Sequence, residues 1–244
     1  VGADGAIGFY RARSHQVVPV KRCLIQPEAA DKTAAAVGEW MRRYKVPAYD
    51  EATGKGLVRH VYVRVNRKGE SLCCVVINGR QAPREPELAA YVCATVPHTA
   101  GVLVNSNTKR GNVILGEKYR TLWGRDYLMD TLCGLEFKLS VPSFYQVNRD
   151  QAEALYGKAL DYAGLTGRET VLDLYCGIGT ITLCLAKRAG RVIGAEIVPA
   201  AIRDAKENAA RNHIENAEFF CGDAAETAAR LEAEGLRPDV ITVD

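Results

Sequence analysis

The clearest fold signal in the chain is V-L-D-L-Y-C-G-I-G-T at residues 171–180. Its first half has the apolar composition of a buried strand. Its second half contains Gly177 and Gly179, which permit a tight turn and a close approach of the backbone to a ligand. A helix is predicted to begin near Thr180. A strand, a glycine turn and a helix in this order indicate a nucleotide-binding α/β fold, with the ligand at the carboxyl end of the strand.

The residues around this stretch alternate between strands and helices. Strands are predicted at 170–176, 191–197, 217–222 and 240–244, and helices at 150–163, about 180–190, 199–212 and about 224–235. Such alternation indicates a parallel, doubly wound, Rossmann-like sheet. The chain stops on the fourth strand, so we expect a truncated sheet.

The N-terminal part of the chain has a different pattern, which predicts an α+β, β-rich domain. A helix is predicted at 27–44, a hairpin from strands 60–66 and 70–78, a short helix at 85–93, further strands at 101–105 and 112–115, and a second hairpin from strands 127–132 and 135–139 across Cys133-Gly134. We therefore divide the chain into domains 1–143 and 144–244.

Charge is distributed unevenly between these two domains. Residues 1–143 hold 21 Lys and Arg against 13 Asp and Glu, a net charge of +8, whereas residues 144–244 have a net charge of −5. A basic domain suggests a polyanionic partner such as RNA. An ordinary solvated surface remains the alternative, since the excess is modest.

Several classes of protein are disfavoured by the sequence. No apolar run reaches the roughly 18 residues of a membrane span. The start lacks both a secretion signal and a methionine, which indicates a fragment. Eight cysteines occur, none spaced as CxxC, and several lie in apolar runs. We expect a monomeric protein of the reducing cytoplasm without a disulfide framework.

Acidic residues lie at the ends of the second and third predicted strands. Glu196, 23 residues past Asp173, is placed to accept hydrogen bonds from ribose hydroxyls. Asp223 is placed to contact adenine or to cap the next helix. Thr182 stands where a dinucleotide fold usually has its third glycine, which weakens an NAD assignment. The combined pattern favours S-adenosylmethionine as the cofactor.

With these motifs the chain resembles the RNA (uracil-C5) methyltransferases, which methylate tRNA and 23S ribosomal RNA. The resemblance rests on S-F-Y-Q-V-N at 143–148, on D-L-Y-C-G-I-G at 173–179, on G-F-Y…H-Q-V-V-P-V-K-R-C at 8–23, and on Glu196, Asp223 and Asp244. It implies a class I methyltransferase sheet behind an RNA-binding domain. It covers nearly the whole chain.

The resemblance implies cofactor contacts at seven positions: Gln146, Tyr175, Gly177, Thr180, Glu196, Asp223 and Asp244. Thr180 stands where the family often has Asn. Asp244 resembles the first residue of a D-P-P-R-type loop between cofactor and target base. Core packing for Tyr175 and a helix-start cap for Gln146 are the structural alternatives.

Some ribosomal RNA members of that family hold an iron–sulfur cluster on four cysteines. Cys23 resembles the fourth ligand, and the other three would precede residue 1. One cysteine cannot hold a 4Fe-4S cluster. A cluster is therefore expected only in a longer protein, and no metal ligand set is assigned within this chain.

The family mechanism is covalent: a cysteine thiolate adds to C6 of uracil, C5 takes the methyl group, and a base then removes the C5 proton to leave 5-methyluridine. The resemblance places both nucleophile and base beyond residue 244. No catalytic residue is assigned here, not even Cys176 beside the glycine turn, and we expect the chain alone to be inactive.

The RNA target base must leave its stack to be methylated. Candidate RNA contacts in the first domain are Arg11, Arg13, Lys21, Arg22, Arg64, Arg67, Lys68, Lys109 and Arg110. The Cys23 segment and the long first domain favour 23S ribosomal RNA over tRNA. The alternatives are another class I methyltransferase, acting on DNA, protein or a small molecule, and a non-catalytic RNA-binding module.

Overall fold

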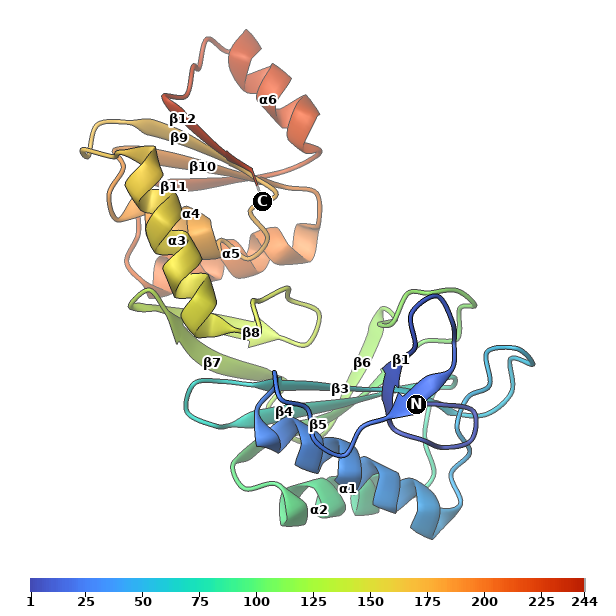
Figure 1. Ribbon diagram of the computed structural model, residues 1–244. Coiled ribbons are helices and arrows are strands. Elements are labelled where there is room, and N and C mark those ends of the chain that lie inside the picture. Colours follow the sequence, from blue (N-terminus) through green and yellow to red (C-terminus); the bar gives the residue numbers. More distant parts are fainter. Residues whose placement is uncertain (244) are drawn as a thin grey trace. The chain divides into compact units, whose positions relative to one another are not determined.

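The computed structural model describes residues 1–243, so Asp244 lies outside the described residues. The chain divides into two compact units (Figure 1). The first unit comprises residues 1–128 and 140–142, and the second comprises residues 129–139 and those from Ser143 onward. The chain therefore crosses between the units three times near residues 128–143.

The first unit is built on a mixed four-stranded sheet of order β3-β4-β5-β6. Its elements are β1 (Gly8–Tyr10), β2 (Val17–Pro19), α1 (Glu28–Tyr44), β3 (Val58–Val65), β4 (Ser71–Ile77), α2 (Glu85–Thr95), β5 (Thr99–Ser106) and β6 (Lys118–Gly124). Strands β3 and β4 form the predicted antiparallel hairpin, β4 and β5 run parallel around α2, and β6 returns antiparallel. Helices α1 and α2 cover one face of the sheet (Figure 1).

Helix α1 forms because its apolar residues repeat at helical spacing and its charges suit the helix dipole. Ala36, Val37, Trp40 and Met41 are buried along one face. Acidic residues lie in its first turn and basic residues in its last turn. The Trp40 indole also donates a hydrogen bond to the backbone carbonyl of Arg84 at 3.0 Å. The prediction of this helix is confirmed.

Strand β4 is buried along its whole length, because both faces of the sheet are covered at its centre. Cys73 faces the core under the helices, and Cys74 belongs to a second cluster with Leu72 and Leu103. These cysteines are free thiols that act as small apolar side chains, as the sequence predicts.

The strand predicted at residues 112–115 is wrong. These residues lie in a loop between β5 and β6, and the Asn107 side-chain amide donates to the carbonyls of Val113, at 2.6 Å, and Ile114, at 3.0 Å. The Asn107 side chain thus takes the hydrogen bonds that these carbonyls would otherwise accept from a neighbouring strand. The strand lies instead at β6, and the short pair β1–β2 was also not predicted.

The hairpin of β7 (Tyr127–Leu132) and β8 (Leu135–Ser140) turns at Cys133 and Gly134, as predicted. Both turn residues have positive φ, 52° and 72°, the conformation that a two-residue turn needs to match the twist of its strands. Residues 129–139 of this hairpin belong to the second unit, where Phe137 is fully buried in the core.

The second unit carries a four-stranded parallel sheet of order β11-β10-β9-β12, which confirms the predicted parallel sheet. Its elements are α3 (Arg149–Ala163), β9 (Thr170–Leu174), α4 (Thr180–Ala186), β10 (Arg191–Glu196), α5 (Pro199–Arg211), β11 (Ala217–Cys221), α6 (Ala224–Ala233) and β12 (Val240–Val243). Helix α4 ends four residues before the predicted end.

Helices cover both faces of this sheet (Figure 1). Helices α3, α4 and α5 pack with the β7–β8 hairpin in one cluster. On the other face, Leu231 of α6 packs against Leu172 and Ile193. Because all four strands are parallel, the turns after β9, β10 and β11 meet at one edge. Within residues 1–243, no helix is both long and apolar enough to cross a membrane.

We predict that Glu169, which shapes the turn before β9, makes folding stability depend on pH. Its carboxylate accepts hydrogen bonds from Thr166, Gly167 and Arg168, and the Thr166 hydroxyl is the largest cause that lowers its pKa from 4.5 to about 2. A lowered carboxyl pKa contributes stability above pH 4.5 that is lost as pH falls towards 2.

The test is urea unfolding of the wild type and Glu169→Gln between pH 7 and pH 2. The variant should unfold at lower urea at pH 7, and the difference should shrink as pH falls from about 4.5 to about 2. A difference that stays constant over this range contradicts the prediction.

Candidate functional site

The turn after β9 has an unusual backbone conformation. Tyr175, Gly177 and Gly179 all have positive φ, of 63°, 55° and 82°. A positive φ is uncommon for tyrosine, and the Tyr175 side chain projects from the strand end with 56% of its surface exposed. The ring is therefore not core, which removes the structural alternative considered for it.

Gly179 is required by space as well as by conformation. A Cβ atom there would lie 3.2 Å from the Phe219 ring and 3.3 Å from the Ala205 side chain. The residue sits at the start of α4, so its lack of a side chain lets that helix lie close against β11 and α5. This explains why the sequence has glycine at that position.

Glu196, the last residue of β10, ties the turn to the neighbouring strand. The Gly177 N–H donates to its Oε2 at 3.1 Å, and the Val198 N–H donates to its Oε1 at 2.8 Å. Its backbone carbonyl accepts from the Gly222 N–H at 3.0 Å. Glu196 is half-buried. One carboxylate therefore lies between the ends of β9, β10 and β11.

Asp223 follows β11 and caps α6. Its Oδ1 accepts from the Ala225 N–H at 2.9 Å and from the Glu226 N–H at 3.2 Å. The side chain is exposed, and its Oδ2 has no hydrogen bond within residues 1–243. Helix capping therefore uses one oxygen and leaves the other accessible at the sheet edge.

Gln146 and Thr180 are placed differently from the residues above. Gln146 is half-buried in the segment between β8 and α3, and its amide makes no hydrogen bond to the described part of the chain. The helix-start cap is Asn148, whose side chain accepts from the Gln151 N–H, so Gln146 is not the cap. The Thr180 hydroxyl lies 3.0 Å from the Tyr156 hydroxyl of α3.

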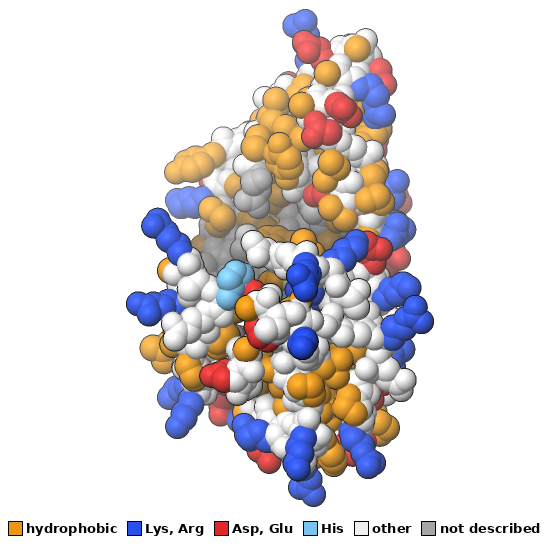
Figure 2. Space-filling view, turned by 90° about the vertical axis from the view of Figure 1, so that its right-hand side faces the viewer, with side chains coloured by type: hydrophobic (Ala, Val, Ile, Leu, Met, Phe, Trp, Pro, Cys, Tyr) orange, Lys and Arg blue, Asp and Glu red, His pale blue; other side chains and the backbone are white. Residues whose placement is uncertain are grey.

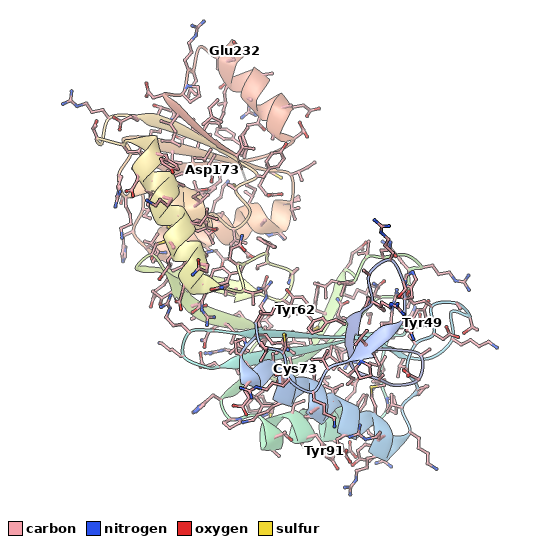
Figure 3. All side chains as sticks on the ribbon, viewed as in Figure 1. Tyr49, Tyr62, Cys73, Tyr91, Asp173 and Glu232 are labelled. Carbon is pink, nitrogen blue, oxygen red and sulfur yellow. The ribbon has the colours of Figure 1, made fainter. Side chains whose placement is uncertain are left out.

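Asp173 lies inside the sheet, in the middle of the second unit (Figure 3). It is buried, and its two oxygens accept from the hydroxyls of Thr182 and Thr242, the latter at 2.7 Å. The carboxylate therefore links β9 to α4 and β12. Through these hydrogen bonds Asp173 stabilises the strands beneath the glycine turn.

Asn208 of α5 was not predicted as a site residue, and the structure shows it fully buried. Its Nδ2 donates to the Ile178 carbonyl, in the middle of the glycine turn, at 3.2 Å, while its Oδ1 accepts from the Lys138 N–H of β8 at 2.9 Å. The signal was present in the sequence: a polar residue follows Ile202 and Ala205 on the apolar stripe of an amphipathic helix.

Asn212, one turn further along α5, makes the same kind of bond to β8 but does not reach the glycine turn. Its Oδ1 accepts from the Glu136 N–H at 2.8 Å, and its Nδ2 donates to the Glu136 carbonyl at 2.7 Å and to the Asn208 carbonyl at 2.8 Å. Two amide side chains thus satisfy the open edge of β8.

Cys176, beside the turn, has a thiol that is poorly suited to act as a nucleophile. Burial raises its pKa far above the ordinary value, and the neighbouring carboxylates of Asp173 and Glu196 raise it further. A thiolate is the reactive form of cysteine.

Cys23, the predicted cluster ligand, is half-buried in the first unit, and its backbone N–H donates to Asp31 at 3.1 Å. Among residues 1–243, no group of three or more His, Cys, Asp or Glu side chains is placed to hold a metal. The described residues therefore provide no partners for Cys23 in an iron–sulfur site.

The structure brings four of the predicted residues together at the carboxyl edge of the sheet: Tyr175, Gly177, Glu196 and Asp223. No hydrogen bond links Gln146 to them within the described residues, and Asp244 lies outside these. A separate cavity of about 370 Å³ between α3 and β12 has mostly apolar walls, including Leu155, Tyr162 and Ile241. Tyr156, Asp173 and Thr242 also line it, whereas Tyr175, Glu196 and Asp223 do not.

Residues 165–244 match the protein family described as a methyltransferase domain. The chain is 44% identical over 238 residues to a protein of Halalkalibacterium halodurans named an uncharacterized RNA methyltransferase, which covers 97% of this chain and 52% of the relative. A protein of the same description from Clostridium acetobutylicum is 41% identical, covering 99% and 53%. The chain thus spans about half the length of these relatives.

Among solved structures, the chain resembles the Pyrococcus abyssi tRNA (uracil-54, C5)-methyltransferase, determined in complex with S-adenosyl-L-homocysteine. The TM-score is 0.75 at 22% identity, and the match covers 91% of this chain and 53% of that protein. This likeness shows that the two proteins share a fold. The family match and the parallel sheet together confirm the predicted methyltransferase-type α/β fold.

Proposed function

We propose that this protein is an S-adenosylmethionine-dependent RNA methyltransferase that acts on C5 of uracil. The observation that carries the proposal is the placement of Glu196, bonded to the N–H of Gly177 and lying beside Asp223 at the carboxyl edge of a parallel sheet. The match to a methyltransferase domain and the names of the relatives support it.

The residues at this edge suit an adenosine-containing cofactor. Each carboxylate oxygen can accept two hydrogen bonds, and each Glu196 oxygen uses one on the backbone, so both can still accept from ribose hydroxyls. The open Oδ2 of Asp223 can accept from the exocyclic amine of adenine. When bound, the cofactor supplies an electrophilic methyl group.

Other residues position and shield the cofactor. The exposed ring of Tyr175 packs against it, which explains why a tyrosine is held at positive φ there. The side-chain amide of Gln146 makes a further contact to the cofactor. Asp173 and Asn208 do not contact the cofactor. Asp173 fixes the strand β9, and Asn208 fixes the glycine turn that lies beneath the cofactor.

The choice of uracil C5 rests on the resemblance of the 143–148 and 173–179 motifs, and the structurally similar Pyrococcus abyssi protein is named a tRNA (uracil-54, C5)-methyltransferase. The basic domain 1–143 binds the RNA. We propose that this RNA is 23S ribosomal RNA rather than tRNA. The covalent route requires a cysteine nucleophile and a base, and neither role is assigned to a residue of this chain.

Deletion of the gene tests the reaction and the substrate. We expect the 5-methyluridine content of 23S ribosomal RNA, measured by nucleoside mass spectrometry, to fall. The wild-type gene should restore it, and a gene carrying Glu196→Ala should not. Loss from tRNA alone overturns the choice of RNA, and unchanged 5-methyluridine in both RNAs overturns the choice of base.

Calorimetric titration with S-adenosylmethionine tests the cofactor site. Glu196→Ala should weaken binding about tenfold or more, because a charged hydrogen-bond acceptor is lost. Glu218→Ala is the matched control, since that carboxylate on the same sheet pairs with Arg191 on the surface at 2.9 Å. No heat from the wild type, or equal affinities for the wild type and Glu196→Ala, contradicts the assignment.

Asn208→Asp should weaken S-adenosylmethionine binding about tenfold, although Asn208 does not touch the cofactor. The variant keeps the acceptor for the Lys138 N–H but cannot donate to the Ile178 carbonyl, so the glycine turn loses its support. Asn212→Asp is the control, because it also loses the side-chain amide donor but does not contact the glycine turn.

Calorimetry gives the affinities of these two variants, and thermal unfolding gives their stabilities. We expect both substitutions to lower the unfolding temperature and only Asn208→Asp to lower the affinity. Equal affinities for the two variants show that Asn208 has no part in positioning the turn.

A further inference from the structure

A second hollow surface lies in the first unit, in a region given no role above. It is a cavity of about 330 Å³ lined by His15, Tyr49, Glu51, Ala52, Arg59, Arg110, Gly111 and Asn112, which we call the loop cavity. Its walls come from the β1–β2 loop, the segment that leads into β3, and the loop between β5 and β6. Its volume is within the usual range of ligand pockets.

One wall is held in place by Arg59, which is 2% exposed. Its guanidinium lies over the Tyr49 ring, 4.6 Å from the centroid. Its Nη1 donates to the carbonyls of Asn107 at 2.9 Å and Lys109 at 2.7 Å. A buried arginine therefore fixes the loop that carries Arg110, so this wall is preorganised rather than free to move.

The opposite wall is held by Glu51. Its Oε1 accepts from the Tyr10 hydroxyl at 3.1 Å, and its Oε2 pairs with Nδ1 of His15. Burial, with Glu51 next in effect, raises the pKa of Tyr10 to about 12, so the hydroxyl stays a donor at neutral pH. The Tyr10 and His15 rings meet edge to face at 5.8 Å, and Tyr10 is 43% exposed.

Exposed cations lie on two of the loops that form the cavity. Arg110 lines it, and Arg11 and Arg13 are in the β1–β2 loop with His15. All three are exposed, and none of them forms an ion pair within residues 1–243. Figure 2 shows Lys and Arg side chains standing out from a face that also exposes a histidine and hydrophobic side chains. Tyr49, labelled in Figure 3, lies on this side of the first unit. Exposed guanidinium groups on these loops suit phosphate oxygens.

The chemistry of the cavity restricts its ligand. A simple anion is disfavoured because the Glu51 carboxylate forms part of the wall. An apolar ligand is disfavoured by the charged groups of Arg110 and Glu51. A flat heterocycle with both donors and acceptors on its edge suits the arginine, the carboxylate and the Asn112 amide together, and its face suits aromatic and guanidinium stacking.

We propose that the loop cavity binds one unstacked nucleotide of the substrate RNA, with the base among His15, Glu51 and Arg110 and the adjoining phosphates on Arg11 and Arg13. This inference rests on the proposed function, since it concerns the RNA that is to be methylated. It adds a contact remote in sequence from the methyltransferase sheet. A base held in this way fixes the register of the strand.

The test is binding of a fluorescein-labelled single-stranded RNA to the chain, followed by anisotropy at several salt concentrations. Arg110→Ala should weaken binding about fivefold or more through the lost base contact, and Arg13→Ala should lower the slope of log K against log salt by about 0.7 through a lost phosphate contact. His15→Leu, which removes the aromatic ring from the cavity wall, should weaken binding similarly through lost stacking while the slope stays unchanged. Arg42→Ala, on α1 and ion-paired with Glu39, is the matched control and should bind as wild type.

Photocrosslinking locates the RNA directly. RNA carrying a photoreactive base should attach to peptides within residues 9–16 or 108–113, identified by mass spectrometry. Crosslinks confined to other segments, or Arg110→Ala binding like Arg42→Ala, overturn the proposal. If the same preparations still bind S-adenosylmethionine, the proposed function stands. If neither RNA nor cofactor binds, both fail.

Discussion

The hydrogen bond between the Gly177 N–H and the Glu196 carboxylate is the interaction around which the candidate site is organised. It joins the turn after one strand to the end of the next, and the same carboxylate holds the start of α5 through Val198. In a parallel sheet these ends lie at one edge, so a single side chain can reach both. Glu196 therefore ties the glycine turn and the start of α5 to each other.

Support for that turn comes from a part of the chain distant in sequence. Asn208 bonds on one side to Ile178 and on the other to β8, more than sixty residues earlier than itself. The hairpin of β7 and β8 thus belongs to the machinery that holds the glycine turn, although it precedes the parallel sheet. The hairpin also contains two of the three points at which the chain crosses between the two units.

A comparable device occurs in the first unit. The buried guanidinium of Arg59 donates hydrogen bonds to backbone carbonyls of the loop between β5 and β6. These bonds give the loop a defined conformation. Asn107 does the same for the carbonyls of Val113 and Ile114. Both cases show polar side chains taking over backbone groups that would otherwise need a strand partner or water. Local sequence gives no sign of either, because the partners are chosen by distance in space.

Most helices and strands could be predicted from the sequence, because each produces a local pattern. The apolar spacing of α1, the alternation in β3 and the Cys133-Gly134 turn are all set by neighbours within a few residues. The prediction failed at residues 112–115, where alternation was present but the carbonyls were bound by Asn107. It also missed β1 and β2, which are too short to show a period.

The acidic residues and glycines of the candidate site could be predicted from the sequence. The residues that hold them in place could not. Glu196 and Asp223 stand at strand ends, and parallel strands bring their ends together by necessity, so sequence alone determined that these residues share an edge. Only the tertiary structure showed that Asn208 holds the turn, that Arg59 shapes the basic loop, and that Asp223 divides its oxygens between helix and surface. The physical reason is that hydrogen bonds and burial depend on three-dimensional distance, which a pattern of residue types does not encode.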